Sequence, residues 1–164
     1  MKRKRIEFLF IILILFMLST GCIYYTFSSG SIDNVSTVFI EPVKNSTLQY
    51  GLENSLESDT KTAFIQDGRL NLVNEDGDIL IKITVKNFKK EPFDYDASGT
   101  VKSYKVSISV KTEINKKGIE KSIYNGNISE WETEDISTFD LQNLIDKVSK
   151  EIASDIVDKL FSHW

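Results

Sequence analysis

The sequence predicts an α+β fold: a two-layer sandwich in which two amphipathic helices pack on one face of a mostly antiparallel sheet of four to five strands. Segments that alternate apolar and polar residues fill the middle of the chain, as in strands with one buried face. Two segments with helical periodicity, residues 51–66 and 140–161, stand near the two ends of this region. A sheet with one apolar face needs a cover, and these two helices can provide it.

The first elements follow from composition. Residues 35–41 are rich in β-branched and aromatic side chains and end at Pro42, which predicts a strand. Residues 51–66 place apolar side chains near one helical face and precede Gly68, a stop signal. Residues 70–73 predict a short strand, and the Asp-Gly pair within residues 74–78 predicts a hairpin to the next one.

The middle of the chain holds the clearest strands. In residues 79–88, Ile79, Ile81, Ile83 and Val85 alternate with Lys82, Thr84 and Lys86. Residues 89–99 are predicted to form a turn-rich loop. Residues 101–114 give the longest alternation, and residues 119–131 return as a partner strand with a bulge at residues 125–127.

The final helix is predicted over residues 140–161. Its apolar side chains recur at the spacing of one helical face, and Asp140 or Thr138 can cap its first turn. The face comprises Leu141, Leu144, Ile145, Val148, Ile152, Ile156 and Leu160.

The N-terminus predicts export and lipidation. Four cationic residues precede an uninterrupted apolar run, Phe8 to Leu18, which is shorter than the roughly 20 residues of a membrane span. Thr20-Gly21-Cys22 resembles a bacterial lipobox, so we expect residues 1–21 to be a signal peptide and Cys22 to carry the lipid. The alternative is a signal peptide that happens to precede a buried free cysteine. Residues 22–34 are predicted to be a tether and residues 35–164 a single domain.

Charge and composition exclude several classes of function. Without residues 1–21 the chain has 16 Lys and Arg against 23 Asp and Glu, a net charge of about −7, which argues against a general nucleic-acid binder. The single cysteine excludes an intrachain disulfide. His163 is the only histidine and stands next to the C-terminus, so no base is well placed for nucleophilic catalysis. We therefore expect no enzymatic activity, no metal and no cofactor.

Lysines concentrate in one stretch. Residues 82–121 hold ten Lys against five acidic residues, whereas the remaining mature chain is strongly acidic. Alternation places some of them on the polar face of neighbouring strands, where they could hold the phosphates of an anionic glycolipid. The candidates are Lys82, Lys86, Lys105 and Lys111. The alternative is a solvated face whose lysines discourage edge-to-edge aggregation.

The order of these features resembles the lipopolysaccharide-assembly lipoprotein family, LptE. The resemblance spans nearly all of the chain after the signal peptide. It rests on Cys22, on residues 39–47, on Gly51-Leu52-Glu53 with Leu56, on Gly68-Arg69, Leu72-Val73 and Asp78-Ile79-Leu80, on Pro92 and Tyr95, and on Ile152-Ala153 and Ile156-Val157.

The resemblance implies a non-enzymatic outer-membrane lipoprotein on the periplasmic side. Its partner would be the β-barrel lipopolysaccharide translocon (LptD-like), which it would bind and plug, with lipopolysaccharide as a further candidate ligand. Ile23, rather than Asp, follows Cys22, which agrees with sorting to the outer membrane. Two other classes remain open: an envelope lipoprotein that acts as scaffold or activator of a cell-wall enzyme, and an uncharacterised hydrolase.

Overall fold

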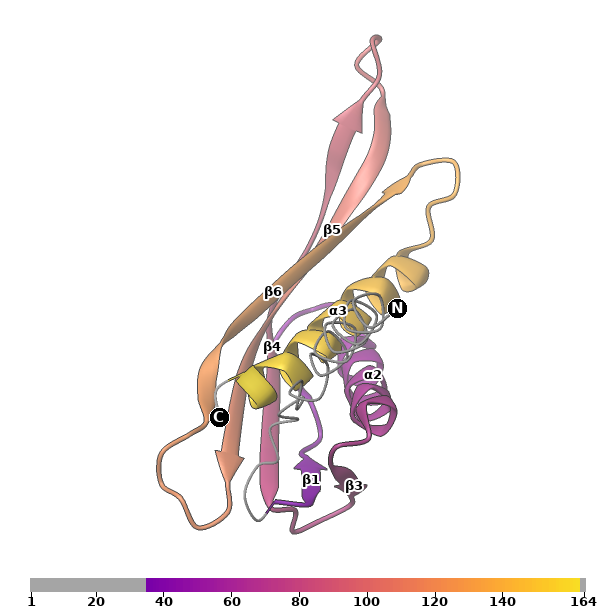
Figure 1. Cartoon of the computed structure of the whole chain (residues 1–164). Helices are drawn as coiled ribbons and strands as arrows, with labels where there is room; N and C mark the ends of the chain where they lie inside the picture. The colour runs from indigo at the N-terminus through magenta and orange to yellow at the C-terminus, as the bar shows by residue number, and fades with distance from the viewer. Residues whose placement is uncertain (1–34, 163–164) are drawn as a thin grey trace, which may run out of the picture. The chain divides into compact units, whose positions relative to one another are not determined.

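The computed structural model describes residues 35–162 (Figure 1). The signal peptide 1–21, the lipidation site Cys22, the tether 22–34 and His163 therefore lie outside the described residues. The elements, in chain order, are β1 (Thr37–Ile40), β2 (Lys44–Asn45), α2 (Leu52–Asp67), β3 (Asn71–Val73), β4 (Ile79–Tyr95), β5 (Val101–Lys116), β6 (Tyr124–Asp135) and α3 (Leu141–Ser162).

The strands form one mixed sheet of six strands in the order β3-β1-β4-β5-β6, with β2 also paired to β4. The two long ladders, β4 with β5 and β5 with β6, are antiparallel. The short strands β1, β2 and β3 pair in parallel. Both helices pack on the same face of this sheet (Figure 1), which confirms the α+β fold with two helices against one sheet face.

The core lies between the sheet and the helices. Alternate residues of β4 and β5 are buried there, as their apolar alternation predicts. The helices contribute Leu52, Leu56 and Phe64 from α2 and a row of apolar side chains from α3. The buried side chains of that row include Leu144, Ile145, Val148, Ile152, Ile156 and Leu160.

The predicted stop residue of α2 and one of the two predicted caps of α3 are confirmed, although each helix is displaced by one residue from its predicted range. Gly68 terminates α2 in the left-handed conformation (φ 72°), and its N–H donates to the carbonyl of Phe64 at 3.1 Å. At the start of α3, the carboxylate of Asp140 accepts from the N–H of Gln142 at 2.9 Å. Asp140 is thus the cap, whereas the hydroxyl of Thr138 donates to the carbonyl of Asp135.

The hairpin predicted at residues 74–78 is wrong. β3 and β4 do not pair, because β1 lies between them and runs parallel to both. The Asp-Gly turn instead passes close to β1: a Cβ on Gly77 would come within 2.6 Å of the backbone nitrogen of Phe39. Turn chemistry reverses the chain direction locally, but it does not determine which strand occupies the space beside the turn.

The loop predicted over residues 89–99 is also wrong in most of its length. β4 continues to Tyr95 and pairs with β5 over nearly its whole course. Register shifts after Val85 and on either side of Asp94 absorb the irregular sequence, including Pro92, which cannot donate to a ladder. The result is a β4–β5 hairpin that extends beyond the N-terminal end of α3 (Figure 1).

The bulge predicted at residues 125–127 is wrong as well. β6 starts at Tyr124 and pairs one-to-one with β5 from Tyr124–Ile114 to Asp135–Ser103. A Cβ on Gly126 would lie 2.6 Å from the hydroxyl of Tyr124. This glycine therefore makes room for a ring within a regular strand.

Candidate functional site on the outer face of the sheet

The side of the sheet opposite the helices carries mostly polar side chains. We call this side, across β4, β5 and β6, the outer face. Even-numbered residues of β4 lie on it before the register shift after Val85, and odd-numbered residues lie on it beyond that shift. Its members include Lys82, Thr84, Glu91, Phe93, Lys105, Ser107, Ser109, Lys111, Glu113, Ser129 and Trp131.

Two of the predicted lysines meet in one pocket. The pocket has a volume of about 180 Å³ and is lined by Glu41, Pro42, Lys44, Lys82, Ile83, Thr84, Lys111 and Glu113. The ammonium nitrogen of Lys82 lies 3.3 Å from the carboxylate of Glu41. Three lysines thus face two glutamates, which leaves a local excess of positive charge.

Lys86 is separate from this pair. It stands at the register shift between Val85 and Asn87, which moves it out of the regular row of outer-face residues. It lines a different hollow beside the loop that precedes α2, together with Ser46, Thr47, Leu48, Gln49, Asn87 and Phe88. The four predicted lysines therefore do not form one cluster.

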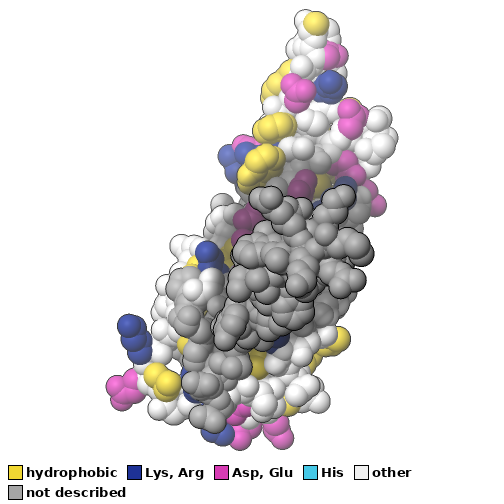
Figure 2. All heavy atoms as spheres, viewed as in Figure 1, with side chains coloured by type: hydrophobic (Ala, Val, Ile, Leu, Met, Phe, Trp, Pro, Cys, Tyr) yellow, Lys and Arg dark blue, Asp and Glu magenta, His cyan; other side chains and the backbone are white. Residues whose placement is uncertain are grey.

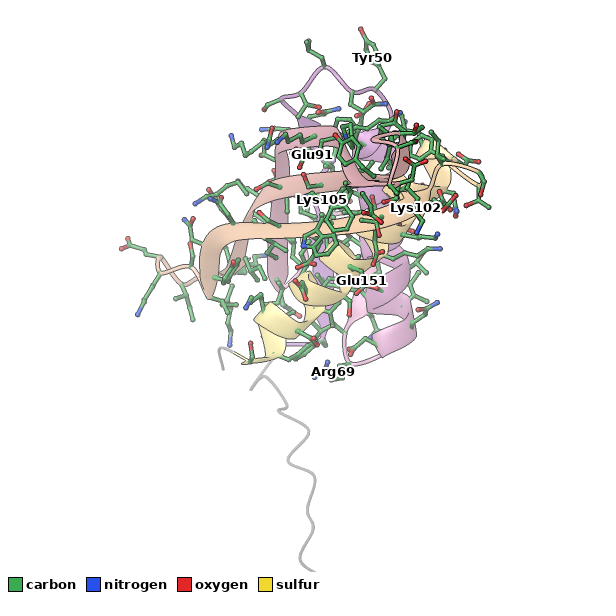
Figure 3. All side chains as sticks on the ribbon, turned by 90° about the horizontal axis from the view of Figure 1, so that it is seen from above. Tyr50, Arg69, Glu91, Lys102, Lys105 and Glu151 are labelled. Carbon is green, nitrogen blue, oxygen red and sulfur yellow. The ribbon has the colours of Figure 1, made fainter. Side chains whose placement is uncertain are left out.

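Lys105 belongs to a third group. Its ammonium nitrogen lies 3.2 Å from the carboxylate of Glu91, which stands opposite it on β4 (Figure 3). Hydrogen bonds from Lys89 and then Lys105 lower the pKa of Glu91 below its ordinary value. This carboxylate remains charged near neutral pH and offsets part of the lysine charge.

The same region holds an aromatic pair that the sequence did not reveal. The rings of Phe93 and Trp131 are 6.0 Å apart, and each side chain is about half exposed. The ammonium nitrogen of Lys105 lies 5.8 Å from the Phe93 centroid and 5.7 Å from that of Trp131. Phe93 falls in the stretch that the sequence predicts to be a loop, so the strand pairings that bring it beside Trp131 could not be predicted.

Apolar and charged side chains are mixed elsewhere on the hairpin. The ammonium group of Lys90 lies over the rings of Tyr104 and Phe139, at 4.6 and 4.1 Å from their centroids. Figure 2 shows hydrophobic side chains exposed among charged ones where the hairpin extends beyond α3. Such a surface can contact an amphiphile or a protein partner.

A third hollow lies between the helices. It has a volume of about 490 Å³ and is lined by Asp59, Thr62, Ala63, Gln66, Asp67, Lys150, Ser154, Val157 and Asp158. Burial raises the pKa of Asp59 above its ordinary value, although the charge of Lys150 opposes this shift. The hollow is polar, and three of its lining side chains are carboxylates.

Among residues 35–162, no group of three or more His, Cys, Asp and Glu side chains could hold a metal ion. None of the helices in this part of the chain is long and apolar enough to cross a membrane.

Comparison with protein families then identifies the chain. The model of the LptE family, described as lipopolysaccharide-assembly, matches residues 35–163, which include every strand and helix described above. The chain belongs to the LptE family. LptE proteins are non-enzymatic lipoproteins associated with lipopolysaccharide assembly and with an LptD-like translocon.

Solved structures agree with this fold. The hypothetical protein CT253 from Chlamydia trachomatis is 10% identical, with a TM-score of 0.58 over 78% of this chain and 97% of that one. Protein XCC0632 from Xanthomonas campestris is 11% identical, with a TM-score of 0.54 over 78% and 85%. A Caulobacter crescentus lipoprotein is 12% identical, with a TM-score of 0.52 over 74% and 88%. None of the curated proteins compared with the chain matches it significantly.

Proposed function

We propose that this LptE-family protein is an outer-membrane lipoprotein that binds and plugs the β-barrel lipopolysaccharide translocon (LptD-like). In this role it supports assembly of the barrel and insertion of lipopolysaccharide at the cell surface. The match of the family model over residues 35–163 carries the proposal. Residues 1–21 would be removed as a signal peptide, Cys22 would carry the lipid, and residues 22–34 would connect it to a domain of residues 35–164.

The charged surface is compatible with a plug. The interior of a large membrane barrel is polar, so a protein seated there can keep charged side chains on its surface. Both the outer face and the hollow between the helices carry charged side chains. A lipid at Cys22 would hold such a domain at the membrane without a spanning helix.

We further propose that the outer face contacts lipopolysaccharide. Lys82 and Lys111 share a pocket where two ammonium groups can bind one phosphate. Lys105 stands beside Phe93 and Trp131, so a cation and apolar rings are available together for an amphiphilic anion. Lys86, on its separate hollow, is the weakest of the four candidates.

Charge reversal tests this contact. We expect Lys82→Glu with Lys111→Glu to weaken lipopolysaccharide binding about tenfold in low salt, and the difference to shrink as salt is added. Lys121→Glu with Lys150→Glu is the matched control, because it changes the net charge equally but leaves the pocket intact. Equal affinities of the two double variants would remove the outer face as a lipopolysaccharide site.

Depletion tests the function in the cell. We expect loss of the protein to lower the amount of folded barrel and the amount of lipopolysaccharide at the cell surface. The competing role, scaffold or activator of a cell-wall enzyme, predicts defective wall synthesis while surface lipopolysaccharide stays normal. That second result would contradict the proposal.

A further inference from the structure

The strand β6 forms a long free edge of the sheet. It has twelve residues and, within the part of the chain that the structure describes, pairs with β5 on one side only (Figure 1). The opposite edge of the sheet, β3, has three residues. An unpaired strand of this length presents a row of backbone donors and acceptors to which another strand can add.

The register shows which backbone groups are free. The N–H of Ile136 donates to the carbonyl of Lys102 at 2.8 Å, in register with the β5–β6 ladder. Because bonded and non-bonded pairs alternate in an antiparallel ladder, even-numbered residues of β6 bond to β5 and odd-numbered ones point their N–H and C=O outward. Among the described residues, Ser129, Trp131 and Thr133 are consecutive outward positions.

The neighbouring outward positions are partly occupied. The carbonyl of Asn127 accepts from the hydroxyl of Tyr124 at 3.2 Å. The carbonyl of Asp135 accepts from the N–H of Thr138 at 3.1 Å. The open part of the edge is therefore centred on Trp131.

Several usual protections of an edge strand are missing from β6. It contains no lysine and no proline, and its pairing with β5 has no bulge. It does carry Glu130 and Glu132 on the side that faces the helices, and inward-pointing charges of this kind oppose pairing between identical edges. The same glutamates would attract an added strand that carries basic side chains.

These glutamates are part of an acidic strip along the same edge. Burial, and then the negative charges of Asp155 and Glu151 on α3 and of Glu132, raise the pKa of Glu130 above its ordinary value. Glu151 is seen on α3 next to β6 (Figure 3). Among residues 35–162, none of these four carboxylates forms an ion pair with lysine or arginine. In contrast, Glu134 at the end of β6 is paired with Lys147 of α3.

We propose that β6 docks an extended, lysine- or arginine-bearing segment of a partner protein, which adds to the sheet as a further strand. Its backbone would pair with Ser129, Trp131 and Thr133, and its basic side chains would face the acidic strip. A second copy of this chain is disfavoured, since two β6 strands side by side would bring like charges together. The inference concerns the partner's chemistry and does not depend on the proposed role in lipopolysaccharide assembly.

The strand also carries a reporter. Trp131 is about half exposed, and a strand added to this edge would cover part of its ring. The sequence has one other tryptophan, Trp164, so a Trp164→Phe chain reports on Trp131 alone. We expect a blue shift of its fluorescence when the edge is occupied.

The test uses the full chain in detergent, with a short synthetic peptide that alternates Lys and Thr. The edge variant is Ser129→Pro with Thr133→Pro, which removes two outward N–H groups and no backbone bond to β5. It also removes the 2.8 Å bond from the Ser129 hydroxyl to that of Ser109 on β5, which the alanine control loses equally. Its matched control is Ser129→Ala with Thr133→Ala, which keeps both N–H groups. We expect the proline variant to bind the peptide about tenfold more weakly than the alanine control.

A second variant covers the case in which the proline variant fails to fold, as judged by circular dichroism and thermal unfolding. Glu130→Gln with Glu132→Gln leaves the backbone intact, and we expect it to weaken binding and to reduce the salt dependence. A peptide alternating Glu and Thr should not bind.

Three results would overturn the proposal. One is equal binding of the basic peptide by the proline and alanine variants, or by the glutamine variant and the unaltered chain. Another is sedimentation showing self-association that the edge substitutions abolish, because the occupant would then be a second copy. The third is much tighter peptide binding after deletion of residues 23–34, which would make this chain's own segment the occupant.

Discussion

Asp78 shows how one side chain joins distant parts of the chain. Its carboxylate accepts hydrogen bonds from the backbone N–H and the hydroxyl of both Ser36 and Thr37, at 2.8–3.2 Å. The N–H of Ser36 contributes most, and together the bonds lower the pKa of Asp78 from 3.8 to about 2. The residue therefore holds the start of β1 to the start of β4.

This pKa predicts a pH dependence. A carboxylate with a lowered pKa in the folded state stabilises the fold above about pH 4, and this contribution is lost as the pH falls toward 2. We expect Asp78→Asn to lower the thermal midpoint by several degrees at pH 7. The difference from the unaltered chain should narrow between pH 4 and pH 2.

The matched control for Asp78 is Asp94→Asn, since Asp94 is exposed and, among residues 35–162, its carboxylate accepts only from the N–H of Tyr95 in its own strand. We expect no comparable effect from it. If both variants melt alike at every pH, the bonds to Ser36 and Thr37 do not anchor β1.

Sequence predicts residue roles well only where the reason is local. Alternation correctly placed Lys82 and Lys111 on the polar side of their strands, and capping rules pointed to Asp140. The anchoring role of Asp78 was missed because its partners lie 41 and 42 positions away in the chain. The aromatic pair depended on a register that no short segment determines.

At the scale of elements, α3 provides much of the cover of the sheet. The helix packs against β5 and β6, and its residue Ile152 is fully buried, whereas the neighbouring Glu151 is exposed. We expect Ile152→Ala to lower the free energy of unfolding by about 2–5 kcal/mol, because it removes buried apolar contacts and leaves a cavity. Urea unfolding of the full chain in detergent measures this difference.

Glu151→Ala is the control for Ile152 and should change stability by no more than about 0.5 kcal/mol. Similar losses for the two variants would mean that α3 is not packed on the sheet through this face.

Periodicity predicted both helices and the two long antiparallel strands, because each buries one face set by its own sequence. It did not predict that β1 enters the sheet between β3 and β4, since parallel pairing joins segments that are distant along the chain. The continuation of β4 through Pro92 was missed for another reason. Register shifts let a turn-like sequence remain in a ladder.

At the scale of the whole molecule, charge is divided among surfaces. The lysine-rich stretch of the sequence contributes the lysines of the outer face, while β6 and α3 carry the acidic strip. The sequence shows that lysines concentrate in residues 82–121, but it does not show which surfaces become basic or acidic, because that depends on the order of the strands in the sheet. A partner that encloses the domain would have to complement both signs at once.

In the role proposed above, this LptE-family protein is seated in a lipopolysaccharide translocon. Affinity purification of the tagged full chain from detergent-solubilised outer membranes tests it most directly. We predict recovery of one large β-barrel protein in equal molar amount, retained at high salt. Recovery of an inner-membrane cell-wall synthase in its place, or of the lipoprotein alone, would contradict the account.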